Sequence, residues 1–327
     1  MDRDDESLPS PWHEGERAVQ ARAGSRERME QVGRLAIRRF MPDQHRAFFA
    51  QLPFLLVGSV DGSGWPWASA LFGWPGFARS PDPGRLDIAA WPVAGDPLRE
   101  SLSLGAPLGL LGIELPTRRR NRMNGHVVAL GERAFSVAVD QSFGNCPQYI
   151  QRRDYAGFDP EALAREPRVE PFAELDDRAR SLITRADTMF VASASAADHP
   201  RERGVDVSHR GGRPGFLGFD PAGAILVPDF RGNRFFNTLG NLVVYPRAGL
   251  LFLDFERGDL LQLTGATEIL WDGPELRSFR GAERLWRFSP SHGQWLLGAL
   301  PLGFAFGDLS MQSLGTGTWA EAGAAQG

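Results

Sequence analysis

The chain contains no lysine, and all 36 residues counted as Lys+Arg are arginines. No side chain is therefore present to form the Schiff base of a pyridoxal phosphate enzyme or to reach a nucleotide phosphate from a Walker loop. A bound phosphate group would have to be held by arginines, backbone N–H groups or hydroxyls. The planar guanidinium fork matches phosphate oxygens, so the search for an anion site turns to the arginines.

Cysteine and long apolar runs are also scarce. Cys146 is the only cysteine, which excludes an intramolecular disulfide and suits a reducing cytosol. The longest apolar runs, such as 104–113, are too short to span a membrane, and the acidic residues 1–6 are unlike a secretory signal. The net charge of −4 gives no footprint for nucleic acid, and the six histidines lack metal-ligand spacing. We expect a cytoplasmic protein with no metal, membrane or nucleic-acid partner.

A weak internal repeat indicates two copies of one module. Residues 109–114 (GLLGIE) match 249–254 (GLLFLD), and each copy has a glycine 16 residues after its start, at Gly125 and Gly265. Residues 54–59 match 190–195 at a nearly equal offset. Short apolar stretches between turn signals are typical of barrels and sandwiches. The predicted fold class is mostly β, a β-barrel with flanking helices, present twice in tandem.

The composition divides the chain into four segments. Residues 1–43 are an N-terminal helical extension with one exposed helix over 16–40, and residues 44–153 form the first barrel. Residues 154–175, rich in Pro, Asp and Glu, form a linker, and residues 176–327 form the second barrel with a frayed end over 319–327. Helices are predicted over 44–52 and 176–185, each before an apolar strand.

The stretch from Val227 to Asn241 has the pattern of an anion-binding turn. It is typical of a strand, a turn with Gly232, and a short helix that starts near Asn233. Pro246 and Gly249 then break the chain before a second apolar strand. Gly232 allows close approach of the backbone to a ligand. Arg234 is expected on the first turn of the helix, where N–H groups and the helix dipole favour an anion.

This arrangement resembles the FMN-binding split barrels of the pyridoxamine 5'-phosphate oxidase family. In that family a strand, a Gly-Ser-Arg-Lys turn and a helix lead into a Pro-Arg-x-x-Leu-Leu-Phe strand, and the turn holds the FMN phosphate. Residues 232–234 (GNR) fall on Gly-Ser-Arg and 246–252 (PRAGLLF) on the strand entry, while Phe235 replaces the lysine. Residues 9–16 and 143–149 look like those of a bacterial tandem-barrel subgroup. The resemblance implies two tandem FMN-binding split β-barrels.

The resemblance also implies a set of cofactor contacts, mainly from the second module. Alternation along 204–212 places Asp206, Ser208 and Arg210 on one face of a strand and His209 on the other. Taken singly, several of these residues fit a polar hairpin end or an ordinary helix cap equally well. The candidate cofactor-binding residues are Asn145, Gln148, Tyr149, Ser208, His209, Arg210, Pro228, Asp229, Asn233, Arg234 and Asn237.

The first module is predicted to carry a degenerate phosphate site. Aligning residues 95–97 (GDP) with 232–234 puts Pro97 in the place of Arg234, and proline also lacks an N–H donor. One FMN per chain is therefore expected.

Two features stay open at this point, and no catalytic residue is assigned. One arginine of 118–122 (RRRNR) either crosses to the second module's phosphate site or belongs to a solvated turn. Cys146 is interpreted as a buried, inert thiol, because no base is evident beside it.

The resemblance implies an FMN-dependent oxidoreductase that acts on a small aromatic or heterocyclic substrate. NAD(P)H or a separate reductase would be its electron donor. The alternatives are a flavin-binding carrier or redox sensor without turnover, and a split barrel that binds haem or deazaflavin, with His209 as the candidate axial ligand of a haem. A homodimer and a monomer both stay open, because two fused barrels supply both faces of a cofactor site from one chain.

Overall fold

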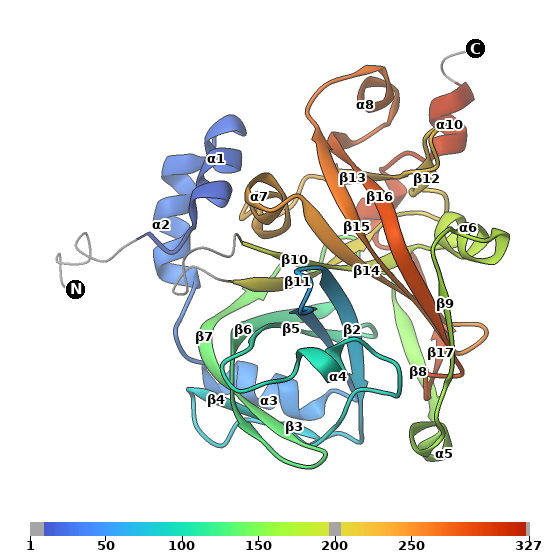
Figure 1. Ribbon diagram of the computed structural model, residues 1–327. Coiled ribbons are helices and arrows are strands. Elements are labelled where there is room, and N and C mark those ends of the chain that lie inside the picture. The colour runs from blue at the N-terminus through green and yellow to red at the C-terminus, as the bar shows by residue number, and fades with distance from the viewer. Residues whose placement is uncertain (1–9, 196–203, 325–327) are drawn as a thin grey trace.

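The computed structural model describes residues 10–195 and 204–324, which form two curled sheets flanked by helices (Figure 1). The predicted fold class, mostly β with barrel-like sheets and flanking helices, is confirmed. In spatial order, the strands of the first sheet are β2 (Pro66–Phe72), β1 (Phe54–Val60), β5 (Pro107–Glu114), β6 (Arg119–Leu130), β7 (Phe135–Asn145), β4 (Arg85–Ile88) and β3 (Ala78–Arg79).

The second sheet repeats this order. Its strands are β11 (Val205–Gly211), β10 (Thr188–Ala194), β14 (Arg247–Asp254), β15 (Asp259–Leu270), β16 (Ala282–Leu297), β13 (Ile225–Phe230) and β12 (Gly218–Phe219). A further strand, β9 (Arg168–Phe172), pairs with β16, and β8 (Arg153–Phe158) pairs with β17 (Leu302–Phe306) in a separate ribbon. The segment 154–175 thus contributes to two paired strands besides the short helix α5 (Pro160–Ala164).

Helices flank these sheets (Figure 1). They are α1 (Glu14–Arg22), α2 (Arg26–Ala36), α3 (Asp43–Gln51), α4 (Leu98–Ser101), α6 (Asp177–Arg185), α7 (Asn237–Val244), α8 (Pro274–Ser278), α9 (Met311–Leu314) and α10 (Trp319–Ala324), in addition to α5. The helices predicted before β1 and β10 are confirmed as α3 and α6. In the described part of the chain, none of the helices combines the length and apolar character needed to cross a membrane.

Strands β1 and β10 are buried on both faces, which explains their unbroken apolar sequences. Leu55 and Val57 of β1 belong to the core of the first sheet, whereas Leu56 belongs to a third core between the two sheets. In β10, Val191 packs into the core of the second sheet and Phe190 into the shared core. Because side chains alternate along a strand, each of these two strands supplies one face to its own core and the other to the shared one.

The strand register corrects one detail of the repeat. Val57 lies opposite Leu110 and Val191 lies opposite Leu250, so Val57 corresponds to Val191. The sequence match of 54–59 with 190–195 is therefore wrong by two residues. A slip of two keeps every side chain on its original face, and for that reason the apolar pattern cannot detect it.

Reciprocal glycine contacts bring the two sheets together. A Cβ on Gly109 of β5 would lie 2.7 Å from the Cα of Asp206 in β11, and a Cβ on Gly249 of β14 would lie 2.6 Å from the Cα of Trp67 in β2. Each contact joins the matching glycine of one module to the matching strand of the other. A side chain at either position would push the modules apart.

Two predictions about the chain ends are wrong. Residues 16–40 form two helices, α1 and α2, because the chain turns at Gly24 with φ 64°, and Glu16 and Gln20 are buried. Residues 319–324, expected to fray, form α10, where Trp319 packs on Phe279 with ring centroids 4.9 Å apart. Tertiary packing decides both cases, and local composition does not report it.

The glycine contact predicts a stability effect. Gly249→Ala is expected to lower the free energy of unfolding by about 1–3 kcal/mol, because the added methyl overlaps the β2 backbone. Urea unfolding would measure the change. Gly62→Ala is the matched control, since no heavy atom lies within 4 Å of its added methyl, and it should stay within about 0.5 kcal/mol of the parent protein. Equal stability of the two variants would contradict this view of the module contact.

Candidate functional site

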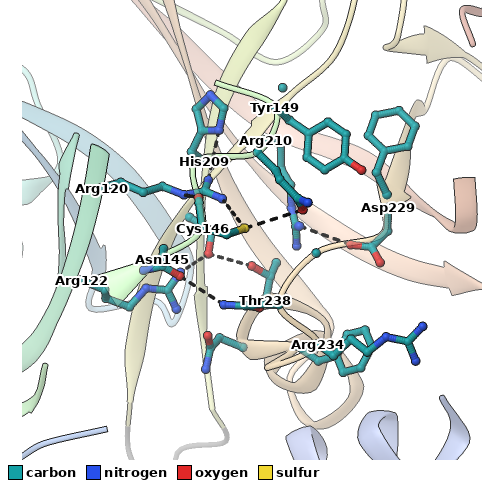
Figure 2. Close-up of a pocket in the computed structure, with 18 of the residues that line it drawn as sticks. Arg120, Arg122, Asn145, Cys146, Tyr149, His209, Arg210, Asp229, Arg234 and Thr238 are labelled. Atoms are coloured by element: carbon teal, nitrogen blue, oxygen red, sulfur yellow. Dashed lines mark hydrogen bonds and ion pairs between the residues drawn. The ribbon is translucent and has the colours of Figure 1, made fainter. Parts of the chain in front are cut away.

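A cavity of about 100 Å³ lies where β6 of the first module meets β11, β13 and the start of α7 in the second (Figure 2). All 11 residues selected from the sequence line it, although they come from three separate stretches of the chain. Those residues are Asn145, Gln148, Tyr149, Ser208, His209, Arg210, Pro228, Asp229, Asn233, Arg234 and Asn237. Their role in binding a cofactor stays a prediction.

Strand β11 separates its polar side chains as predicted. Ser208 and Asp206 both contact Arg122, and Asp206 Oδ1 accepts from Arg122 Nη1 at 2.8 Å. His209 points to the opposite face, where its ring packs edge-on against Phe190 at 5.7 Å. Burial, followed by the charge of Arg120, lowers the pKa of His209 well below its usual value, so its imidazole is neutral at physiological pH.

Two arginines of the basic run line the cavity and contact the second module there. Arg122 is 3% exposed and reaches Asp206 and Ser208, while Arg120 donates from Nη1 toward His209 Nδ1 at 3.3 Å and from Nε to the Cys146 carbonyl at 2.8 Å. The alternative in which one of these arginines reaches the other module is thus favoured over a solvated turn, while its role at a phosphate site stays a prediction. Arg118 pairs with Asp308 of the second module, away from the cavity. A β-strand explains the result, because Arg120 and Arg122 are two residues apart and share a face.

The chain before α7 differs from the prediction. The helix begins at Asn237, four residues after Asn233, and Arg234 and Phe236 before it have left-handed φ values of 63° and 62°. Arg234 is therefore not on the first helical turn. Its guanidinium lies 3.3 Å from the Ala23 carbonyl oxygen and 3.4 Å from Glu283 Oε1.

The aligned first-module segment 95–97 also meets its helix differently. Helix α4 begins immediately after Pro97, and the Leu98 N–H donates to Asp96 Oδ1 at 2.9 Å. In the first module the helix starts one residue after the aligned Pro97, whereas in the second it starts three residues after Arg234, so the alignment does not match the two helix starts.

The asparagines of α7 are already engaged within the protein. Asn237 Nδ2 donates to Glu16 Oε1 at 2.5 Å, and Asn241 Nδ2 donates to Ser193 Oγ and Asp206 Oδ2, each at 3.0 Å. Both are buried. Asn237 borders the cavity, whereas Asn241 is absent from its lining.

The 145–149 loop forms another wall of the cavity. Tyr149, with φ 64°, donates its hydroxyl to the Arg231 carbonyl at 3.0 Å and stacks on Phe230 at 5.2 Å. Burial raises the pKa of the Tyr149 phenol, which keeps it protonated at neutral pH. Cys146 is half-buried in the cavity wall, with Arg120 Nη2 3.7 Å from its Sγ, so the prediction of a buried thiol is wrong.

Positive charge exceeds negative charge around this cavity. Arg210 Nη1 and Arg284 Nη1 lie 3.2 and 3.4 Å from the two oxygens of Asp229, whose pKa is raised by burial. Arg120 has no carboxylate partner in the described residues. The network holds five arginines against three carboxylates, an excess of two positive charges: Arg120, Arg122, Arg210, Arg234 and Arg284 against Asp206, Asp229 and Glu283.

The equivalent place in the first module is closed by side chains. Gln262 of β15 has the register position of Arg122 in β6, and Ser69 of β2 has that of Ser208 in β11. Gln262 Nε2 donates to Asp96 Oδ2 at 3.1 Å, and Ser69 Oγ donates to Asp96 Oδ1 at 2.6 Å. Asp96 is 2% exposed, and burial raises its pKa to about 6. The polar groups here are satisfied within the chain.

Several residues that shape the cavity were missed from the sequence, namely Glu16, Asp206, Thr238 and Arg284. The internal repeat offered one usable signal. Its two copies are 140 residues apart, so Arg122 corresponds to Gln262, and this difference indicates that the two modules are chemically different at this position. The other contacts join residues far apart in the chain. Within residues 10–195 and 204–324, no group of three or more His, Cys, Asp or Glu side chains is placed to hold a metal ion.

Comparison with known proteins gives weak structural similarity only. No protein-family model and no curated sequence matches the chain significantly. HupZ from Group A Streptococcus is 12% identical over 36% of this chain and 90% of its own, with a TM-score of 0.29. A pyridoxamine 5'-phosphate oxidase candidate from Lactobacillus delbrueckii is 16% identical over 32% of this chain and 95% of its own, with a TM-score of 0.26. MotI/DgrA from Bacillus subtilis is 11% identical, covering 74% and 87%, with a TM-score of 0.22. TM-scores this low carry no argument about ligand or activity.

The buried Arg122–Asp206 pair predicts a large stability effect. Arg122→Met would leave the carboxylate of Asp206 buried without its cation, so we expect a loss of about 3–5 kcal/mol in the free energy of unfolding. Chemical denaturation would measure it. Arg133→Met, an exposed arginine at the far end of the β6–β7 hairpin, is the control and should change stability by less than about 0.5 kcal/mol. A loss no larger than that of the control would show that this pair does not join the modules.

Proposed function

We propose that the cavity between the modules binds the phosphate of FMN and that the protein is an FMN-dependent oxidoreductase. The observation that carries the proposal is the excess of two positive charges in a largely buried network, with Arg120 lacking a carboxylate partner in the described residues. Buried charge is costly unless it is paired. A phosphate monoester carries about −1.5 to −2 charges at neutral pH and would balance this excess.

The donor groups suit a phosphate. Arg120 and Arg210 line the cavity with guanidinium groups, which bind phosphate oxygens in a planar, bidentate manner. Burial lowers the pKa of both arginines, and an anion beside them would favour their charged forms. Ser208 and Thr238 add hydroxyls at the same wall, 3.1 Å from each other.

The size of the cavity limits what it encloses. At about 100 Å³ it is smaller than the ~300–1,000 Å³ pockets that surround whole ligands, so we assign to it the phosphate end of the cofactor. Bound flavin would supply hydride or electron transfer. The chain would anchor the phosphate through its arginines and exclude water from the buried end. NAD(P)H or a separate reductase would supply electrons, and the substrate would be a small aromatic or heterocyclic compound.

The same small volume favours a second candidate function, a flavin-binding carrier or redox sensor without turnover. In that case the arginines still hold the phosphate, but no substrate reaches the flavin. The visible spectrum of the purified protein with added FMN, recorded before and after NADH and NADPH, separates the two. Bleaching of the flavin bands supports the oxidoreductase, and stable bands support the carrier or sensor. A Soret band would move the assignment to haem.

The phosphate assignment predicts a specific loss of affinity. Arg120→Met should weaken FMN binding about 10- to 100-fold, since each charge-assisted hydrogen bond contributes about 1.5–3 kcal/mol. Binding of riboflavin, which lacks the phosphate, should be weak in both proteins and unaffected by the substitution. Fluorescence titration would measure both ligands, with Arg133→Met as the control. Equal affinity for FMN in the parent protein and in Arg120→Met, or equal affinity for FMN and riboflavin, would overturn the assignment.

A further inference from the structure

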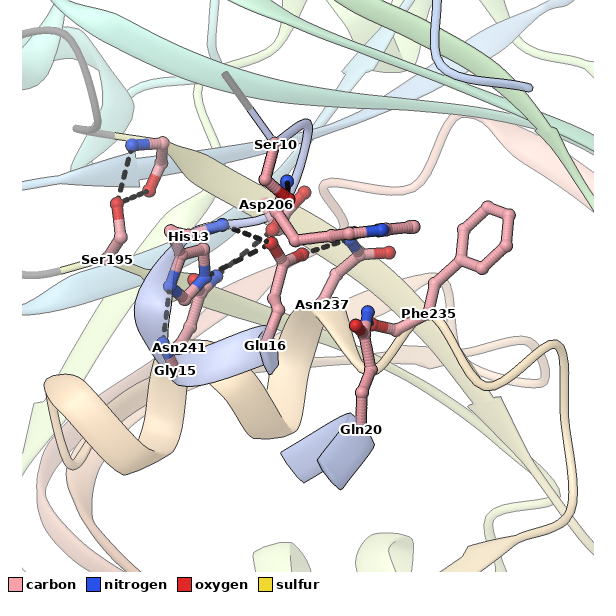
Figure 3. Close-up of polar contacts among 12 residues, drawn as sticks. Ser10, His13, Gly15, Glu16, Gln20, Ser195, Asp206, Phe235, Asn237 and Asn241 are labelled. Carbon is pink, nitrogen blue, oxygen red and sulfur yellow. Dashed lines mark hydrogen bonds and ion pairs between the residues drawn. The ribbon is translucent and has the colours of Figure 1, made fainter. Parts of the chain in front are cut away.

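Helix α1 docks tightly against α7, the helix that begins at the cavity (Figure 3). The two helices meet at glycines: a Cβ added to Gly240 would lie 2.7 Å from the Cα of Glu16. Beside this contact, Trp12 packs on Phe235 with ring centroids 4.9 Å apart, and Gln20 Nε2 donates to the Phe235 carbonyl at 3.2 Å. The N-terminal segment thus packs against α7 and the residues just before it, some of which line the cavity.

The carboxyl group of Glu16 is inserted at the centre of this contact. The residue is 4% exposed. Its Oε1 accepts from Asn237 Nδ2 at 2.5 Å, and its Oε2 accepts from the His13 N–H at 3.0 Å. The charged or titratable groups that face it are His13 on α1, whose Nε2 lies 3.6 Å from Oε2, Asp206 on β11, and Arg122 on β6. The first turn of α7 presents the neutral Asn237.

The segment held by α1 is the one that borders the cavity. Arg234, Phe236 and Asn237 all line it, and the first two have left-handed backbone conformations that cost free energy in residues other than glycine. Such conformations persist only where surrounding contacts impose them. Here the contacts come from α1 and the residue that follows it, through Glu16, Gln20 and the Ala23 carbonyl.

We propose that Glu16 is a positioning residue for the anion site: its neutral carboxyl group docks α1 and holds Asn237 and the segment before it against the cavity, and its ionisation weakens that docking. The ligand part of this inference rests on the proposed function, whereas the docking part does not. The geometry supports it, because an ionised Glu16 would lie in a buried contact beside the carboxylate of Asp206. Arg122, which faces both groups, is already paired with Asp206, and His13, 3.6 Å away, is a cation only when it is protonated.

The direction of the pH dependence follows from the same contacts. Burial and then the charge of Asp206 raise the pKa of Glu16 from 4.5 to about 8, against the opposing effects of Asn237, His13 and Arg122. When α1 is undocked, Glu16 is solvated and ionises near its ordinary value. Docking is therefore fully favoured below pH 4.5 and weakens as pH rises to about 8, by up to about tenfold per pH unit, after which it levels off.

Hydrogen exchange of the α1 amides tests the docking part without any ligand. Protection, corrected for intrinsic exchange, should fall steeply between pH 5.5 and 8 in the parent protein and stay level in Glu16→Gln. Gln preserves the N-terminal cap, and Asn237 accommodates it by turning its amide. Glu14→Gln, at an exposed position of the same helix, should keep the parent slope, and α6, which contains no histidine, should show no slope in any protein. A level parent profile, or the parent slope in Glu16→Gln, would overturn the proposal.

FMN affinity tests the positioning part. Between pH 7 and 8.5 the FMN phosphate is mostly dianionic, so its own titration adds little. Over this range the parent protein should lose up to about tenfold in affinity, Glu16→Gln should hold its affinity, and Glu16→Ala should bind weakly throughout. The same pH dependence in the parent and in Glu16→Gln would overturn the positioning role. Absence of FMN binding in every protein would overturn the proposed function instead, and hydrogen exchange would still decide on Glu16.

Discussion

The close approach of the two sheets is the constraint on which the rest of the structure depends. Gly109 and Gly249 let each module place a strand against the other, and this brings the arginines of β6 within reach of β11. A wider separation would leave Arg122 without Asp206 and would leave Arg120 in solvent. The cavity is therefore a property of the pair of modules, since its walls come from both and neither sheet supplies them alone.

The near-symmetry of this contact makes the chemical difference between its two halves informative. At matching positions, one half has Arg122 with Ser208 and the other has Gln262 with Ser69. Where Gln262 stands, the buried carboxyl of Asp96 completes the hydrogen bonds from within the chain. Where Arg122 stands, a cavity remains and cationic groups outnumber carboxylates. The same backbone arrangement therefore has its polar groups satisfied within the chain in the half with Gln262 and Ser69, and has a cavity in the half with Arg122 and Ser208. A few side chains make the difference.

The sequence predicted residues that line the cavity, but it did not predict how their side chains are oriented or which distant residues they contact. The repeat and the strand patterns located the sheets. The mixed polar segments at 145–149 and 204–212 both face one cavity. Alternation along a strand, which is a local rule, accounts for the second segment, whereas the first was selected by its loop-like composition. The orientation of Arg234 was beyond such rules, since it depends on Glu283 and on the Ala23 carbonyl, both distant in the chain. The insertion of Glu16 depends in the same way on Gly240, whose only local signal is that of a small residue in a helix.

The arginine excess and the buried Glu16 belong to one electrostatic network, joined through Asp206, which pairs with Arg122 and raises the pKa of Glu16. An anion in the cavity would balance the arginines and, by repulsion, make ionisation of Glu16 less favourable. Because linkage is reciprocal, a state with neutral Glu16 and docked α1 would bind that anion more tightly by the same factor. The N-terminal helix and the cavity are therefore coupled: binding of an anion in the cavity would favour the protonated form of Glu16 on α1.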